Sequence, residues 1–215
     1  MTFSIVSLTK SECAKFIKEK HYTRKESIFW CGFGLVENGM VEGVVVYGQP
    51  SPPIQKYAFS NRDFKLYELS RLVVQTKTKN AASFLIANSL KLLEKPCAVV
   101  SYADSSHGHC GIVYQATNWI YTGATISHDN QFKLGDEIYH RMSIRDMGIA
   151  DIKQWIAENN VQIIKPKEKH RYFYICGNKR DKTDMLSKLK YEIIPVYPKT
   201  EKTMYDDGNV IVMPK

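Results

Sequence analysis

The chain has 215 residues, of which 44% are hydrophobic and 24% charged, a composition typical of a globular protein with a substantial core. No apolar run approaches the roughly 20 residues that a membrane-spanning helix needs, and the first ten residues lack a signal-peptide pattern, so we expect a cytoplasmic protein without a membrane partner. Five scattered cysteines without a CxxC spacing argue against a disulfide framework and against a Cys-rich zinc site. The net charge of +8 indicates a polyanionic partner.

The first fifty residues show strand and helix patterns in turn. Residues 4–8 predict a short strand, and residues 9–19 predict a capped helix. Residues 29–37 and 40–47 predict two strands joined at Asn38-Gly39, which is a strong hairpin signal. Prolines and a glycine follow at once, and they predict a loop that reaches to about residue 62.

The rest of the chain is organised around residues 66–123. Leu66–Val74 predicts a strand, Ser83–Leu93 an amphipathic helix and Ala98–Ala103 a second strand, which is the layout of a βαβ unit. An α/β protein keeps its chemistry at strand ends and in loops. We therefore expect an α/β fold whose functional residues lie at the ends of these two strands.

The polar loop that precedes the predicted helix, QTKTKNAA, is a candidate pyrophosphate site, because a helix N-terminus offers free N–H groups to anions. Its match to the acyl-CoA pattern basic-x-x-Gly-x-Gly/Ala is imperfect. Lys77 and Ala82 fit the pattern, but Asn80 stands where glycine is expected. The candidate cofactor-binding residues of this loop are Lys77, Lys79, Asn80, Ala82 and Ser83.

The C-terminal third predicts helices over 149–159 and 183–189 and a strand over 171–176. We see no repeat or flexible linker, which favours one domain over residues 1–215. Within it, residues 165–199 hold ten Lys/Arg against four Asp/Glu, interleaved with aromatic residues. Such a mixture suits binding to a nucleic-acid backbone with base stacking, and it equally suits a solvated basic face over an aromatic core.

Several polar residues stand out within or beside the apolar strands. By alternation, Glu68 shares one strand face with Ser70, while Arg71 lies on the other, so each charge needs an internal partner or a ligand. Asp104 ends a strand, a common place for a base or a metal ligand. With His107 and His109 it forms a possible three-ligand site, although an H-x-H pair is more often structural or exposed.

These pieces occur together in the Mom DNA-modification proteins of phages, which the sequence resembles over roughly residues 18–199. The resemblance is specific as a combination rather than in any one piece. It rests on His21-Tyr22, Glu68–Leu72, Ser101–Asp104, Gly108-His109, Tyr114–Gly123, His140-Arg141, Lys169–Tyr172, Lys188–Tyr191 and Tyr197–Lys199.

The resemblance implies a GNAT-like fold, that of the N-acetyltransferases, with a mixed twisted sheet and helices on both faces. It implies conversion of adenine in double-stranded DNA to an N6-carbamoylmethyl derivative, which protects the DNA from restriction in the bacterial host cell. It also implies acetyl-CoA or a related small-molecule acyl donor, and iron. His21, Tyr22, Asp104 and Tyr114 become candidates for the metal and catalytic centre, with Glu68 as a further catalytic candidate. Arg71 becomes a candidate for binding the donor, as a cofactor-binding residue, or the substrate.

The implied chemistry is demanding, because the lone pair of adenine N6 is delocalised into the ring. A base such as Asp104 or Tyr114 would help acyl transfer, whereas a carbamoylmethyl group requires an N–CH2 bond, for which a redox metal would account. The adenine must leave the base stack, and Tyr22, Trp30 or Tyr114 could receive it. The basic segment would then hold the DNA backbone, with these candidate contacts: Lys169, Arg171, Lys179, Arg180 and Lys190.

Two other functions remain open. One is an ordinary acyl-CoA-dependent N-acetyltransferase that acts on a protein or a small amine. The other is a DNA-binding protein that uses the same scaffold without catalysis. The concentration of polar residues at His21-Tyr22, Asp104 and Tyr114 favours catalysis over simple binding, and the imperfect loop before the helix argues against an ordinary acetyltransferase.

Overall fold

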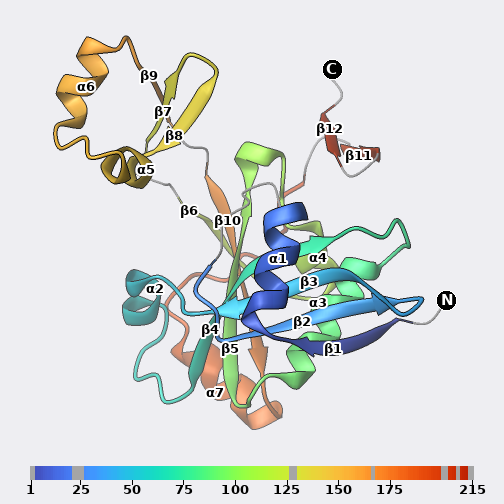
Figure 1. The fold of residues 1–215 in the computed structure, drawn as a ribbon. Helices are drawn as coiled ribbons and strands as arrows, with labels where there is room; N and C mark the ends of the chain where they lie inside the picture. The colour runs from blue at the N-terminus through green and yellow to red at the C-terminus, as the bar shows by residue number, and fades with distance from the viewer. Residues whose placement is uncertain are drawn as a thin grey trace.

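A computed structural model describes residues 3–20, 27–125, 130–165 and 168–199, together with the backbone of residues 203–206 and 209–212. Seven strands form the central sheet, in the order β1-β2-β3-β4-β5-β10-β6 (Figure 1). Only β4 and β5 run parallel, and every other neighbouring pair is antiparallel. The strands are β1 (Ser4–Leu8), β2 (Cys31–Glu37), β3 (Met40–Gly48), β4 (Lys65–Val74), β5 (Cys97–Asp104), β6 (Ile120–Thr125) and β10 (Lys169–Cys176).

Helices cover both faces of this sheet. One face packs against α3 (Ala81–Leu92) and α4 (Ile112–Ala116), and the other packs against α1 (Lys10–Lys20), α2 (Pro52–Tyr57) and α7 (Lys179–Lys188). The alternation of apolar residues along the strands supplies both cores. The predicted α/β fold with a mixed sheet and helices on both faces is therefore confirmed.

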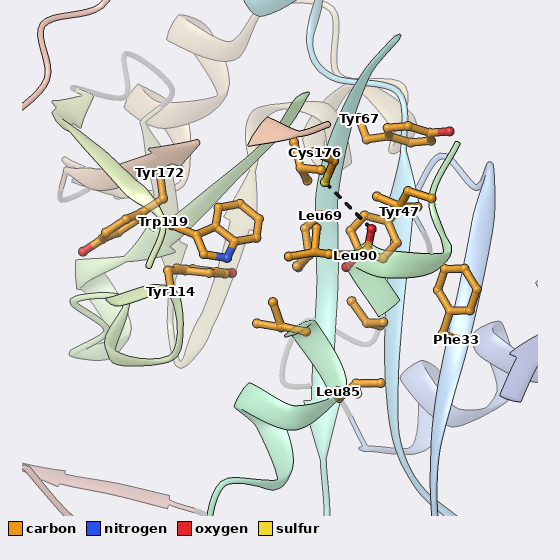
Figure 2. Close-up of a cluster of buried hydrophobic side chains, with 14 of the residues drawn as sticks. Phe33, Tyr47, Tyr67, Leu69, Leu85, Leu90, Tyr114, Trp119, Tyr172 and Cys176 are labelled. Atoms are coloured by element: carbon orange, nitrogen blue, oxygen red, sulfur yellow. Dashed lines mark hydrogen bonds between the residues drawn. The ribbon is translucent and has the colours of Figure 1, made fainter. Parts of the chain in front are cut away.

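The α3 face carries the larger core, in which aromatic rings take much of the space (Figure 2). Trp119 is completely buried and packs against Tyr114 and Tyr174, with ring centroids 5.0 and 5.6 Å apart. Full burial of one large apolar side chain stabilises a fold by about 1.5–3 kcal/mol. This cluster thus anchors α4, which is too short to be stable alone.

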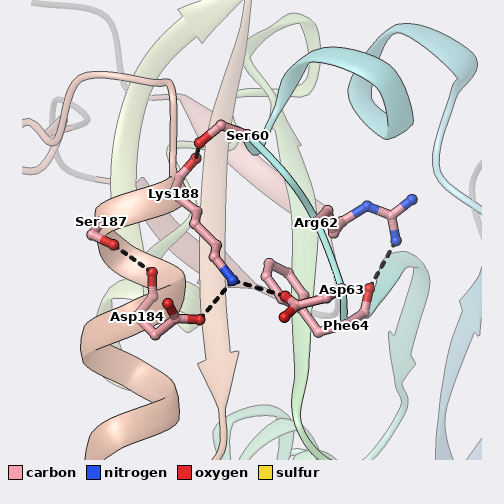
Figure 3. Close-up of polar contacts among 7 residues, drawn as sticks. All are labelled: Ser60, Arg62, Asp63, Phe64, Asp184, Ser187 and Lys188. Carbon is pink, nitrogen blue, oxygen red and sulfur yellow. Dashed lines mark hydrogen bonds and ion pairs between the residues drawn. The ribbon is translucent and has the colours of Figure 1, made fainter.

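On the opposite face, polar contacts fix α7 to the segment that leads into β4 (Figure 3). The Lys188 ammonium lies 2.9 Å from Asp63 and 2.8 Å from Asp184, and the Ser60 N–H donates to the Lys188 carbonyl at 2.8 Å. The sequence predicted only a loop around residues 50–62, yet α2 forms there, with prolines in its first turn. α7 begins four residues before its predicted start, because Asn178 and Asp181 form a capping box.

The chain between β6 and β10 builds a small unit that the sequence did not predict as a sheet. Its strands pair in the order β8-β7-β9, and its own core contains Phe132, Ile144 and Val161. It rises from the end of the sheet where β5 finishes (Figure 1), because its two stems pair at Thr125 and Lys169. The elements are β7 (Gln131–Leu134), β8 (Glu137–His140), α5 (Arg141–Asp146), α6 (Ile152–Glu158) and β9 (Gln162–Ile164).

A hairpin of β11 (Thr203–Asp206) and β12 (Asn209–Val212) ends the described chain. None of the helices in the described ranges has the length and apolar character needed to cross a membrane.

Candidate active site

The two parallel strands separate halfway along their length. β4 pairs with β5 only where Lys65–Glu68 lie beside Cys97–Val100. Beyond these residues, β4 stays paired with β3, and β5 stays paired with β10. A cavity of about 230 Å³ fills the resulting opening, lined by residues 69–72 of β4, 102–104 of β5 and 109–114 at the start of α4. Three consecutive residues of a strand can line one cavity only along its backbone edge, so the opening presents backbone N–H and C=O groups to a ligand.

Tyr114 closes this opening on the α3 face. Its side chain is buried, and the Ser101 hydroxyl oxygen lies 2.8 Å from the Tyr114 hydroxyl and 2.8 Å from the Leu69 carbonyl oxygen. Because the carbonyl can only accept, Ser101 donates to Leu69 and accepts from Tyr114. The Ser101 hydroxyl thereby joins the two diverging strands to α4.

Asp104 lies at the end of β5, beside the same opening. Its carboxylate accepts the Ser106 N–H at 2.9 Å and lies 3.2 Å from the Lys169 ammonium. Burial alone would raise the pKa of Asp104, but the hydrogen bond from Ser106 and the charge of Lys169 outweigh it and hold that pKa below its usual value. Asp104 is thus an anion at neutral pH, already paired with a cation.

Glu68 occupies the last paired position of β4, where the strands begin to separate. Burial raises the pKa of Glu68, although a backbone N–H of Ser51 and the charges of Arg71 and Lys169 partly oppose the shift. Glu68 directly precedes the residues of β4 that line the opening, and a carboxyl group with a raised pKa suits a general base.

The expectation from alternation that Arg71 points away from Glu68 is wrong. A bulge in β4 pairs Arg71 with Val46 and Leu69 with Tyr47, and Ser70 is the extra residue. The bulge returns Arg71 to the face that carries Glu68, because an extra residue shifts the alternation by one. Arg71 lines the opening, and its guanidinium donates to the Ser70 carbonyl at 2.6 Å.

Asn80, which departs from the expected glycine, adopts a left-handed conformation with φ 63° and ψ 8°. Glycine favours this region, and asparagine tolerates it better than most residues do. The backbone can therefore follow the turn that the glycine of the acyl-CoA pattern would make. Asn80 is the N-cap of α3 and makes no side-chain capping bond, which leaves the first N–H groups of the helix available around Ala82 and Ser83.

The residues assigned to a metal centre divide into two groups. His21 and Tyr22 lie outside the described residues. Asp104 and Tyr114 both line the opening, but each already has a hydrogen-bonding partner. Across the described part of the chain, no three His, Cys, Asp or Glu side chains gather as metal ligands do. The described residues alone therefore do not form an iron site, and the metal role of these four residues stays a prediction.

The remaining candidates, His107, His109 and Trp30, differ in their relation to the opening. His109 lines the opening, whereas the His107 side chain lies outside the described part of the chain. Trp30 packs against Tyr67 with ring centroids 5.5 Å apart, in the half of β4 that still pairs with β5, and it does not line the opening.

The predicted DNA-binding residues lie at both ends of β10. Lys169 pairs with Asp104 beside the opening, whereas Lys179 and Arg180 form the first turn of α7, after the other end of the strand. The eight residues of β10 span about 25 Å, so Lys169 is too far from Lys179 and Arg180 to form a single basic patch with them. Lys190 follows α7, and its backbone N–H donates to the Ala58 carbonyl at 2.9 Å.

Arg171 is held within the protein. Its guanidinium donates to the side chain and the backbone carbonyl of Thr122 at 3.0 and 2.9 Å, and it stacks over the Tyr191 ring at 3.5 Å. Sequence reasoning did not single out Ser101, the partner of Tyr114, or the contact between the Tyr121 hydroxyl and His170 Nδ1 at 2.9 Å. No local signal marks these pairs, because their members are distant in the sequence.

A mixed sheet whose two parallel strands separate around a cavity defines the class of protein: this is the GNAT fold of N-acetyltransferases, as predicted. The chain is similar to the Arabidopsis thaliana NAA60 in complex with a bisubstrate analogue (TM-score 0.50, 11% identity), covering 81% of this chain and 98% of that one. Arabidopsis thaliana NAA60 in complex with acetyl-CoA gives a TM-score of 0.49 at 9% sequence identity, and the match covers 81% of this chain and 98% of that one. An N-acetyltransferase from Staphylococcus aureus Mu50 gives a TM-score of 0.46 at 15% sequence identity, and the match covers 81% of this chain and 99% of that one.

No curated protein sequence matches the chain. The model of the Mom protein family matches residues 2–199, and the chain belongs to this family. The resemblance seen in the sequence is thereby confirmed.

Proposed function

We propose that this protein is a DNA-modification enzyme that adds a carbamoylmethyl group to adenine N6 in double-stranded DNA. Membership of the Mom family over residues 2–199 is the observation that carries the proposal. The opening between β4 and β5 supports it, because this opening is a concave site with convergent polar groups. The modified base would protect phage DNA from restriction inside a bacterial cell.

The donor is assigned to the opening and to the N-terminus of α3. Acetyl-CoA or a related acyl donor has an extended amide-bearing arm, which can pair with the backbone edges that β4 and β5 present. The left-handed turn at Asn80 and the basic residues Lys77 and Lys79 favour a pyrophosphate at the helix N-terminus. Arg71, at the edge of the opening, provides a further cation.

The acceptor base is assigned to the rim where Glu68 and Asp104 lie. Glu68 accepts the N6 proton as the new bond forms, because its raised pKa makes it a stronger base than an exposed glutamate. Tyr114 lines the opening and is the candidate acid that protonates the leaving group of the donor as the bond to N6 forms. Asp104 orients the adenine by accepting a hydrogen bond from the adenine amino group. The described residues do not form an iron site alone, so no step is assigned to a metal.

The test is expression in bacteria, digestion of total DNA to nucleosides, and mass spectrometry of deoxyadenosine. We expect an adduct with the mass of a carbamoylmethyl group, and we expect Asp104→Asn to abolish it. Lys153→Gln, in α6, changes one charge away from the opening and serves as the matched control. Unmodified DNA from cells that contain folded protein would contradict the proposal and favour an ordinary N-acetyltransferase, for which acyl-CoA binding is the next assay.

A further inference from the structure

A second and larger groove, of about 700 Å³, extends along α3 from Asn80 and Ser83, where the donor is proposed to bind, to the last residues of β10. α4 has only five residues, and its last residue, Ala116, lines the groove. Residues Tyr174 to Gly177 line the groove together with Lys95 and Lys182. The described residues that line it include lysines from separate elements and no carboxylate.

Two thiols meet where this groove touches the core. Cys176 faces Cys97 directly, as the last pair of the antiparallel ladder between β5 and β10. Directly opposed residues in such a ladder have Cα atoms about 4.5–5.5 Å apart. A disulfide bond requires a Cα separation of about 4.4–6.8 Å. The Cα separation expected for this pair is therefore within the range that a disulfide bond requires.

The two thiols differ in acidity. A hydrogen bond from Cys97 lowers the pKa of Cys176, and the charges of Lys95 and Lys182 lower it further, against the effect of burial. The same contact and burial raise the pKa of Cys97. Protonated Cys176 donates instead to the Leu90 carbonyl at 3.8 Å (Figure 2). Cys176 therefore ionises first, and a thiolate is the reactive form of cysteine.

Access follows the same order. Cys176 lines the groove with 4% of its surface exposed, whereas Cys97 is completely buried behind it. A small oxidant in the groove thus reaches Cys176 before Cys97. The arrangement combines a more acidic thiol at a cavity with a less acidic thiol directly opposite it in the ladder.

We propose that Cys176 and Cys97 form a two-thiol oxidation site that reacts with a small hydroperoxide and closes to a disulfide. The Cys176 thiolate attacks one oxygen of hydrogen peroxide, the O–O bond breaks, and the departing hydroxide takes a proton to become water. The Cys97 sulfur then attacks the sulfenic acid sulfur, the S–O bond breaks, and the Cys97 proton completes a second water molecule. Two thiols lose two electrons, and one peroxide is reduced to two waters.

Two of the three other thiols provide an internal comparison. Burial raises the pKa of Cys13 to about 11 and also raises the pKa of Cys31. Cys13 lies in α1 and Cys31 in β2, so no strand ladder holds them in register. We expect both to remain thiols under conditions that oxidise Cys176.

The experiment treats the purified full chain with hydrogen peroxide, quenches it in acid, blocks free thiols and maps peptides without reduction. We expect an intact mass lower by two hydrogens, one linked peptide pair that joins Cys97 to Cys176, and full reversal by a reductant. The reaction should accelerate as pH rises through the pKa of Cys176. Oxidised protein should also unfold at a higher temperature, because the cross-link restricts the unfolded chain.

Variants distinguish the two roles. Cys97→Ser should stop at a sulfenic acid on Cys176 that a dimedone probe captures, whereas Cys176→Ser should leave Cys97 unmodified. Cys97→Ala, which preserves a small apolar side chain in the core, replaces Cys97→Ser if the latter fails to fold. Cys13→Ser is the matched control and should keep the linked pair. A different pair of linked cysteines, or thiols that all survive peroxide, would overturn the proposal.

Discussion

The hydroxyl groups of Ser101 and Tyr114 lie 2.8 Å apart and connect β5 to α4 at the point where β4 and β5 separate. Ser101 also contacts the Leu69 carbonyl of β4 at 2.8 Å. One hydroxyl therefore links three elements around the opening. The relationship makes Tyr114 both a structural contact and a candidate proton donor, and substitutions can separate these roles.

Tyr114→Phe should remove the proton donor and keep the ring packing against Trp119. We expect DNA modification to fall by roughly 10²- to 10⁴-fold, the range of general acid–base catalysis. The free energy of unfolding should fall by only about 0.5–1.5 kcal/mol, the net contribution of one hydrogen bond. Nucleoside mass spectrometry and urea unfolding measure the two effects.

Tyr197→Phe is the matched control, because the Tyr197 hydroxyl donates to the Trp119 carbonyl at 2.7 Å away from the opening. It should lower stability to a similar extent and leave modification unchanged. Equal activity of Tyr114→Phe and Tyr197→Phe would remove Tyr114 from the catalytic set.

The raised pKa of Glu68 predicts how the modification rate changes with pH on the acid side of its profile. Because burial raises its pKa, the modification rate should increase with pH through a value above the roughly 4.3 of an exposed glutamate. Glu68→Gln should abolish this limb together with most of the activity. A pH profile of Glu68→Gln that matches the wild type would assign the base elsewhere.

The same shift predicts an effect of Glu68 on folding. A folded-state pKa above the unfolded value gives stability that is present at low pH and lost as pH rises through the folded pKa. At neutral pH the buried charge opposes folding, so Glu68→Gln should raise the melting temperature at pH 7 relative to the wild type and lose this advantage near pH 4. Thermal unfolding at the two pH values tests the sign.

Asp104 should behave in the opposite way. Its pKa is held below the usual value with help from Lys169, so its contribution to stability is present above the unfolded pKa and lost as pH falls through the folded one. Lys169→Gln should raise the pKa of Asp104, as carboxyl carbon chemical shifts in NMR would report. An unchanged titration would show that the ion pair does not persist in solution.

Asn80 gives a prediction about backbone geometry. Asn80→Gly should be tolerated, because glycine adopts the left-handed turn freely. Asn80→Val should cost about 1–2 kcal/mol of stability, because a β-branched residue is strained there. It should also weaken acyl-CoA binding, measured by calorimetry. Equal donor affinity in the two variants would separate this turn from the donor site.

The local patterns of the sequence were sufficient for most of the framework. The Asn38-Gly39 hairpin, the βαβ unit and the strand that became β10 are all present, because each depends on alternation or turn chemistry within a few residues. The elements that escaped prediction include α2, α4, β6 and the β8-β7-β9 sheet, all of which consist of short segments. β7 and β8 pair with each other across Gly135-Asp136, whereas β9 joins β7 from further along the chain.

The candidate site shows the same division between what local sequence patterns predict and what only the tertiary structure reveals. The sequence by itself determined the residue types, the family resemblance, the strand that carries Glu68 and the strand end at which Asp104 lies. Only the tertiary structure decided that β4 and β5 separate, that a bulge at Ser70 brings Arg71 to the face of Glu68, and that Cys97 lies opposite Cys176. Alternation depends on adjacent residues, whereas register and bulges depend on how distant strands pair.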